Sequence, residues 1–65
     1  MPFVQIALGE GRTEEQKRLV IARVTDALCE ALNAPREAVR ILILDVPSIN
    51  WGIAGVPAKD RKPQS

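Results

Sequence analysis

The sequence contains no histidine and a single cysteine, Cys29, and these absences exclude several kinds of site. One cysteine cannot close a disulfide within the chain, and one cysteine without histidine cannot complete a zinc site. Histidine is also the usual general base near neutral pH, so any acid–base chemistry must use another group. Cys29 falls at an apolar position of a predicted helix, where we expect it to fill the core.

A strong charge of one sign and long apolar runs are also missing. Nine basic and eight acidic side chains give a net charge of +1, which offers no basis for binding nucleic acid or a membrane surface. No apolar run is long enough to predict a transmembrane helix. The first residues lack the basic stretch of a secretory signal, and with the lone cysteine this indicates a cytoplasmic protein.

The length predicts one small domain, residues 1–65, with a polar tail at about 58–65. A domain of this size buries only about 60% of the surface of its unfolded chain, so it is marginally stable as a monomer. With disulfides and zinc excluded, oligomerisation is the expected source of further stability. The apolar content of 46% is ample for so short a chain.

The spacing of apolar and breaking residues predicts an α+β fold. Thr13 and Gln16 have the spacing of a capping box, and apolar residues then recur at helical intervals. The predicted elements are a strand at 3–8, a helix at 14–32, a strand at 39–46 and a short hairpin at 51–56. A helix between two strands predicts a β-α-β unit with parallel strands.

The second predicted strand is apolar at four successive positions, Ile41–Leu44, so we expect both of its faces to be buried. One helix can cover only one face of a two-stranded sheet. The other face is therefore expected to pack against another subunit.

Two arginines and the only tryptophan are candidate site residues. Arg40 lies in the apolar strand, where its charge must be paired, placed at an edge, or used to bind a carboxylate at a subunit interface. Arg12 lies where the glycine-rich turn meets the helix, and taken alone it is typical of a solvated side chain. Trp51 is either a packing residue or a pocket wall.

Pro2 has two interpretations. Proline lacks the N–H of a strand ladder, so it is well suited to the first residue of a strand. If Met1 is removed, Pro2 also carries a free secondary amine, which can act as a base. The eight acidic side chains are scattered, and no two of them are placed as an acid and base pair.

Together these segments resemble the 4-oxalocrotonate tautomerases, also called 2-hydroxymuconate tautomerases. The resemblance rests on Pro2 behind the initiator methionine, on EGRTEEQK beginning at Glu10, on Val39-Arg40, and on WGIAG at 51–55. It covers residues 2 to about 58 without a gap. It implies a β-α-β unit with a C-terminal hairpin, assembled as a homohexamer that is a trimer of dimers.

The resemblance also implies a reaction. The enzyme is expected to be a cofactor-independent and metal-independent keto–enol isomerase of small enol acids such as 2-hydroxymuconate. Pro2 is the implied general base, and Arg12 and Arg40 from neighbouring subunits are the implied ligands of the substrate carboxylate and 2-oxo group. Trp51 is the implied pocket aromatic. An apolar pocket and nearby guanidinium groups would lower the pKa of the Pro2 amine toward working pH.

The sequence departs from this family at two pocket positions. Trp51 replaces a phenylalanine, and Gly9 replaces a bulkier apolar residue, so the substrate is less certain than the proton transfer. One alternative is a 3-haloacrylate hydratase or dehalogenase, whose relatives have a water-activating glutamate where Ile53 stands here and an arginine where Gly9 stands. The other alternative is a non-catalytic oligomeric protein, in which Pro2 only begins a strand and Met1 is retained.

Overall fold

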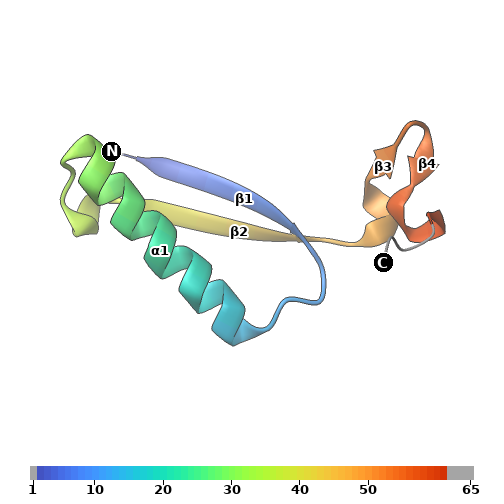
Figure 1. The fold of residues 1–65 in the computed structure, drawn as a ribbon, viewed down its shortest axis with the longest axis horizontal. Helices are drawn as coiled ribbons and strands as arrows, with labels where there is room; N and C mark the ends of the chain where they lie inside the picture. The colour runs from blue at the N-terminus through green and yellow to red at the C-terminus, as the bar shows by residue number, and fades with distance from the viewer. Residues whose placement is uncertain (1, 62–65) are drawn as a thin grey trace.

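The computed structural model describes residues 2–61 as a β-α-β unit followed by a small hairpin (Figure 1). The elements are β1 (Phe3–Gly9), α1 (Glu14–Leu32), β2 (Arg40–Val46), β3 (Gly52–Ile53) and β4 (Val56–Pro57), with single 3-10 turns at Arg36–Ala38, Ser48–Asn50 and Ala58–Asp60. This confirms the predicted fold class and element order. Within residues 2–61, no helix has the length and apolarity needed to cross a membrane.

The boundaries differ slightly from the predictions. β1 continues through Gly9, one residue beyond the predicted end, and β2 begins at Arg40 rather than at Val39. The predicted tail at 58–65 opens with a 3-10 turn, which is anchored where the Ala58 N–H donates to the Trp51 carbonyl at 2.9 Å. Residues 62–65 of that tail lie outside the described residues.

β1 and β2 pair in parallel, with Phe3 opposite Arg40 and Gly9 opposite Val46. The ladder is extended at one end by the Arg40 N–H, which donates to the Pro2 carbonyl at 3.0 Å. At the other end the Glu10 N–H donates to the Val46 carbonyl at 3.1 Å. Pro2 is therefore held at the start of the sheet through its carbonyl, which is compatible with its lack of an N–H donor.

The predicted capping box begins α1. The Thr13 hydroxyl accepts from the Gln16 N–H, and the Gln16 side-chain carbonyl accepts from the Thr13 N–H, each at 3.1 Å. Lys17 of the first turn forms an ion pair of 2.7 Å with Asp45 near the end of β2. The helix ends at Asn33, whose left-handed φ of 53° is readily adopted by asparagine. The start of α1, which only Thr13 separates from Arg12, is thus fixed locally and against the sheet.

We expect the substitution Thr13→Ala to lower the free energy of unfolding by about 1 kcal/mol, because the Gln16 N–H loses its acceptor. Thr13→Ser keeps the hydroxyl and should stay close to the wild type. Urea unfolding at one fixed protein concentration measures the difference, since assembly can contribute to stability. Equal stability of the alanine and serine variants would show that the cap contributes nothing.

A second ion pair joins α1 to the turn that follows it: Arg36 of the turn donates to the Asp26 carboxylate of the helix. The hydrogen bond from Arg36 to Asp26, and then the charge of that carboxylate, raise the pKa of the guanidinium above its ordinary value. Both side chains are well exposed. Such a pair orients the turn after α1 but contributes little to stability.

The prediction that both faces of Ile41–Leu44 are buried is wrong for the single chain. Exposure alternates along β2: Ile41 and Ile43 are half-buried, whereas Leu42 and Leu44 are exposed, Leu44 by 46%. Phe3 of β1 is 61% exposed. The reason is that α1, the one α-helix among residues 2–61, lies on one face of the sheet and leaves the other face uncovered in this chain (Figure 1).

Candidate active site

The predicted site residues form two groups at opposite ends of the β1–β2 sheet. Pro2 and Arg40 lie where the strands begin, and Gly9 lies where β1 ends. Arg12 follows in the turn beyond β1, and Trp51 follows the 3-10 turn beyond β2. A strand of seven residues spans about 20 Å, so one chain does not bring the two groups together.

In the first group, Arg40 is exposed at the first position of β2. Its guanidinium donates to the carbonyl of Glu37 and, at 3.4 Å, to that of Val39. Carbonyl groups orient a guanidinium without neutralising it. Among the described residues the ion pairs involve other basic side chains, namely Lys17, Arg18 and Arg36. The charge of Arg40 is therefore available to an added carboxylate beside Pro2.

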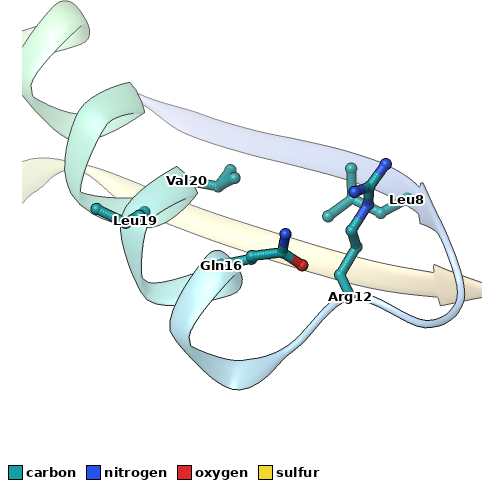
Figure 2. Close-up of a pocket in the computed structure, with 5 residues that line it drawn as sticks. All are labelled: Leu8, Arg12, Gln16, Leu19 and Val20. Atoms are coloured by element: carbon teal, nitrogen blue, oxygen red, sulfur yellow. The ribbon is translucent and has the colours of Figure 1, made fainter.

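In the second group, Arg12 borders an apolar hollow of about 350 Å³, which we call the Arg12 hollow (Figure 2). Its lining residues are Leu8, Arg12, Gln16, Leu19 and Val20. Gly11 precedes Arg12 with a φ of 108°, a conformation that few residues other than glycine adopt, so the turn depends on this glycine. A guanidinium at the rim of an apolar hollow is suited to an acid with a carbon chain.

The sequence did not identify Gln16 as a lining residue, because its role in the capping box already explained it. Figure 2 draws Gln16 on the first turn of α1 beside Arg12, from which it is four residues distant in sequence. Arg12 precedes the N-cap Thr13 and lies outside the helix, so helical spacing could not have indicated this neighbour.

Gly9 and Trp51 share a second hollow, of about 320 Å³, which we call the Trp51 hollow. Its lining residues are Ala7, Leu8, Gly9, Val46 and Trp51. Trp51 is 44% exposed, so it lines the hollow while part of its surface stays open. The structure thus places Gly9 and Trp51, the two positions singled out in the sequence analysis as departures from the family pattern, around one hollow.

The hairpin turns through Ala54 and Gly55, both at positive φ (53° and 83°), between Ile53 and Val56. Two such residues give the tight turn that matches the twist of paired strands. Ile53 is exposed, and its carbonyl accepts from Arg61 at 3.5 Å. An isoleucine side chain has no group that could activate water. Within residues 2–61, no three potential metal-binding side chains (His, Cys, Asp or Glu) gather as a metal site would require.

Comparison with known proteins places this geometry among enzymes. The family model described as "Tautomerase enzyme" matches residues 2–61. A 2-hydroxymuconate tautomerase of Comamonas testosteroni is 62% identical over 60 residues, covering 92% of this chain and 95% of the relative. One from Pseudomonas putida is 58% identical over 60 residues, with the same coverage of both chains.

Solved structures agree. A structure from work on the 4-oxalocrotonate tautomerase isozymes of Methylibium petroleiphilum matches with a TM-score of 0.86 at 66% identity, covering 89% of this chain and 94% of that one. A structure from work on a heterohexamer 4-oxalocrotonate tautomerase of Chloroflexus aurantiacus has a TM-score of 0.89 at 29% identity, covering 95% of this chain and 100% of that one.

Proposed function

The chain belongs to the tautomerase family and is an isomerase of the 4-oxalocrotonate tautomerase type, and from this premise we propose that Pro2 is its general base and 2-hydroxymuconate-like enol acids are its substrates. The observation that carries the proposal is the high identity to two 2-hydroxymuconate tautomerases over nearly the whole chain. The enzymatic assignment replaces the non-catalytic alternative. No observation favours haloacrylate chemistry, and Ile53 and Gly9 lack the groups it would use.

In the proposed reaction the free Pro2 nitrogen accepts the proton of the enol hydroxyl. The C–O bond becomes a carbonyl, the electron pair moves along the conjugated chain, and a carbon atom takes the proton back from the Pro2 ammonium group. Substrate and product are isomers, so no other reactant is consumed. The chain supplies this base at the start of β1, where its carbonyl is fixed by the Arg40 N–H.

The two arginines are proposed to bind the acid and to stabilise the developing dienolate. One guanidinium grips a carboxylate in bidentate fashion, and the other donates to the 2-oxo oxygen as negative charge forms there. The absence of an ion pair at either side chain among the described residues supports these roles for Arg12 and Arg40.

A complete site is proposed to need more than one chain. Arg12 and Arg40 lie near opposite ends of a strand of about 20 Å, which is too far for one small acid to contact both. The open apolar face of the sheet, which includes Leu42 and Leu44, offers the surface through which chains associate. We propose the homohexamer, a trimer of dimers, and the cytoplasmic location expected from the sequence.

The decisive assay is the ketonisation of 2-hydroxymuconate, followed by the loss of dienol absorbance. We expect turnover without added metal and an unchanged kcat/KM after treatment with a chelator, because the reaction requires only a base and hydrogen-bond donors. A rate that falls on chelation and returns with a metal would contradict the mechanism. Chloride release from 3-chloroacrylate should be absent in the same preparation.

A further inference from the structure

Arg12 lies on a segment of the chain that packing does not hold in place. Every residue from 9 to 16 is exposed, and nothing stands within 4 Å of a Cβ placed on Gly11. The segment curves away from the strands before it enters α1 (Figure 1). The Arg12 guanidinium has no ion-pair partner within residues 2–61. The position of this side chain therefore depends on how the two ends of the segment are attached.

Both ends are attached to consecutive residues at the end of β2. At the first end, the Glu10 N–H donates to the Val46 carbonyl at 3.1 Å. At the second end, Lys17 Nζ lies 2.7 Å from Asp45 Oδ2. Lys17 is also the first residue after Arg12 that is half-buried. The loop that carries Arg12 is thus closed on the sheet by one backbone hydrogen bond and one ion pair.

Lys17 connects this ion pair directly to the residue beside Arg12. Its N–H donates to the carbonyl of Thr13, the next residue after Arg12, at 3.0 Å. Asp45 lies opposite Leu8 in the parallel ladder, and Leu8 lines the Arg12 hollow. Neither Lys17 nor Asp45 is among the lining residues. The ion pair is therefore placed to set the position of Arg12 without contacting an acid bound in the hollow.

The other two ion pairs within residues 2–61 do not join α1 to the sheet. Arg18, for example, pairs with Glu14 one turn earlier on the same helix, and both side chains are largely exposed. Such exposed pairs contribute little to stability. The pair of Lys17 with Asp45 differs because it connects residues 28 positions apart and because the lysine side chain is only 29% exposed. Its distinctive property is the attachment of the Arg12 loop to β2.

We propose that Lys17 and Asp45 are positioning residues for Arg12. Their ion pair holds the exposed loop against the end of β2 and so fixes where the guanidinium meets the substrate. The inference rests on the proposed function, because it assumes that Arg12 binds the enol acid. Without the pair, one end of the loop is released, and the enzyme loses the preorganised position of Arg12 on which efficient catalysis depends.

The first test compares kcat/KM for 2-hydroxymuconate in the wild type, Lys17→Met and Asp45→Asn. Methionine keeps an unbranched apolar stem, and asparagine keeps the shape of aspartate, so each variant removes the ion pair with little change in packing. Each should lower kcat/KM by about ten- to a hundredfold, because a misplacement of about 1 Å can cost 10²-fold.

Two further variants control this comparison. Glu14→Gln breaks the exposed pair with Arg18 on the same helix and should keep the wild-type kcat/KM. Asp45→Glu keeps a carboxylate for Lys17 and should recover most of the activity that Asp45→Asn loses. An unchanged kcat/KM in Lys17→Met and Asp45→Asn, or an Asp45→Glu protein no better than Asp45→Asn, would overturn the positioning role.

A double-mutant cycle separates positioning from a general structural effect. If the ion pair acts through Arg12, Asp45→Asn should cost nothing further when it is added to Arg12→Ala, because the side chain that it positions is absent. Losses that multiply would reject the proposal, since the pair would then support the site independently of Arg12. Full activity of Arg12→Ala, or a wild type that does not turn over 2-hydroxymuconate, would instead remove the proposed function and the positioning role with it.

Amide ¹⁵N relaxation gives a second readout that does not depend on turnover. The amides of Gly11, Arg12 and Thr13 should become more mobile in Asp45→Asn and stay as in the wild type in Glu14→Gln. Gel filtration should show the same assembly for all of these proteins. Equal mobility of the three amides in Asp45→Asn and the wild type would contradict the proposal. Loss of assembly in Asp45→Asn would also contradict it, because the pair would then act on the association of chains.

Discussion

An enzyme whose Pro2 nitrogen is blocked by a preceding residue should lose activity by about 10²- to 10⁴-fold, which is the usual contribution of a positioned general base. The physical reason is that an amide nitrogen shares its electron pair with the carbonyl and cannot accept a proton. The chain offers no histidine as a substitute. The measurement is kcat/KM for 2-hydroxymuconate, with the intact mass of each preparation showing whether Met1 is present.

The structure makes this test selective for chemistry over folding. Pro2 is held by its carbonyl, so neither a preceding residue nor its removal takes a bond from the β1–β2 ladder. Pro2→Ala should also lose most activity, since it replaces the ring amine. Pro35→Ala, in the turn after α1, is the matched proline control and should keep the wild-type rate. Full activity in the blocked protein would remove Pro2 as the base.

Mixing two inactive variants should restore activity if each site draws its arginines from different chains. Arg12→Ala and Arg40→Ala are each expected to lower kcat/KM by about 10²- to 10³-fold, the effect of removing one donor from the developing negative charge. When the two are unfolded together and refolded, some sites receive Arg12 from one chain and Arg40 from the other. Those sites have the wild-type set, so the mixture should exceed either parent.

The control for mixing is Arg12→Ala combined with the double variant Arg12→Ala/Arg40→Ala. No site in that mixture can contain Arg12, so its activity should stay at the level of the parents. The prediction follows from the length of β1, which separates the two arginines by about 20 Å within a chain. If the first mixture also stays at the parental level while its chains demonstrably co-assemble, both arginines act from one chain.

Much of the fold could be predicted because its signals are local. Thr13 and Gln16 indicated the start of α1, and the helix between the strands required parallel pairing; both expectations are confirmed. The hairpin at 51–56 was indicated by its glycines, and Gly55 does occupy a positive φ. These features depend on residues within a few positions of one another, which a sequence displays directly.

Other features depend on partners far apart in sequence. The ion pair of Lys17 with Asp45 joins residues 28 positions apart, and no local sequence pattern predicts it. The apolar run Ile41–Leu44 predicted burial of both faces, but the sequence does not say which face the helix covers and which stays open in the single chain. Likewise, Gly9 and Trp51 were each notable alone, and only the fold places them around one hollow.

The resemblance to the tautomerase family suggested functional roles that the chemistry of single residues could not indicate. Arg12 taken alone is typical of a solvated side chain, and Pro2 alone is a sound first residue for a strand. The roles proposed for them come from the position of both in a family pattern. The structure adds that Arg40 donates to backbone carbonyls rather than to an acid, and that Arg12 borders an apolar hollow.

The most direct measurement of the central claim is the titration of the Pro2 amine itself, observed by ¹⁵N NMR in protein labelled at proline and freed of Met1. The profile of kcat/KM against pH should rise through the apparent pKa at which the catalytic base loses its proton. The Pro2 amine should titrate with that same apparent pKa. Coincidence of the two values is the expected result. An amine that titrates well away from that limb, while the enzyme turns over 2-hydroxymuconate normally, would contradict Pro2 as the base.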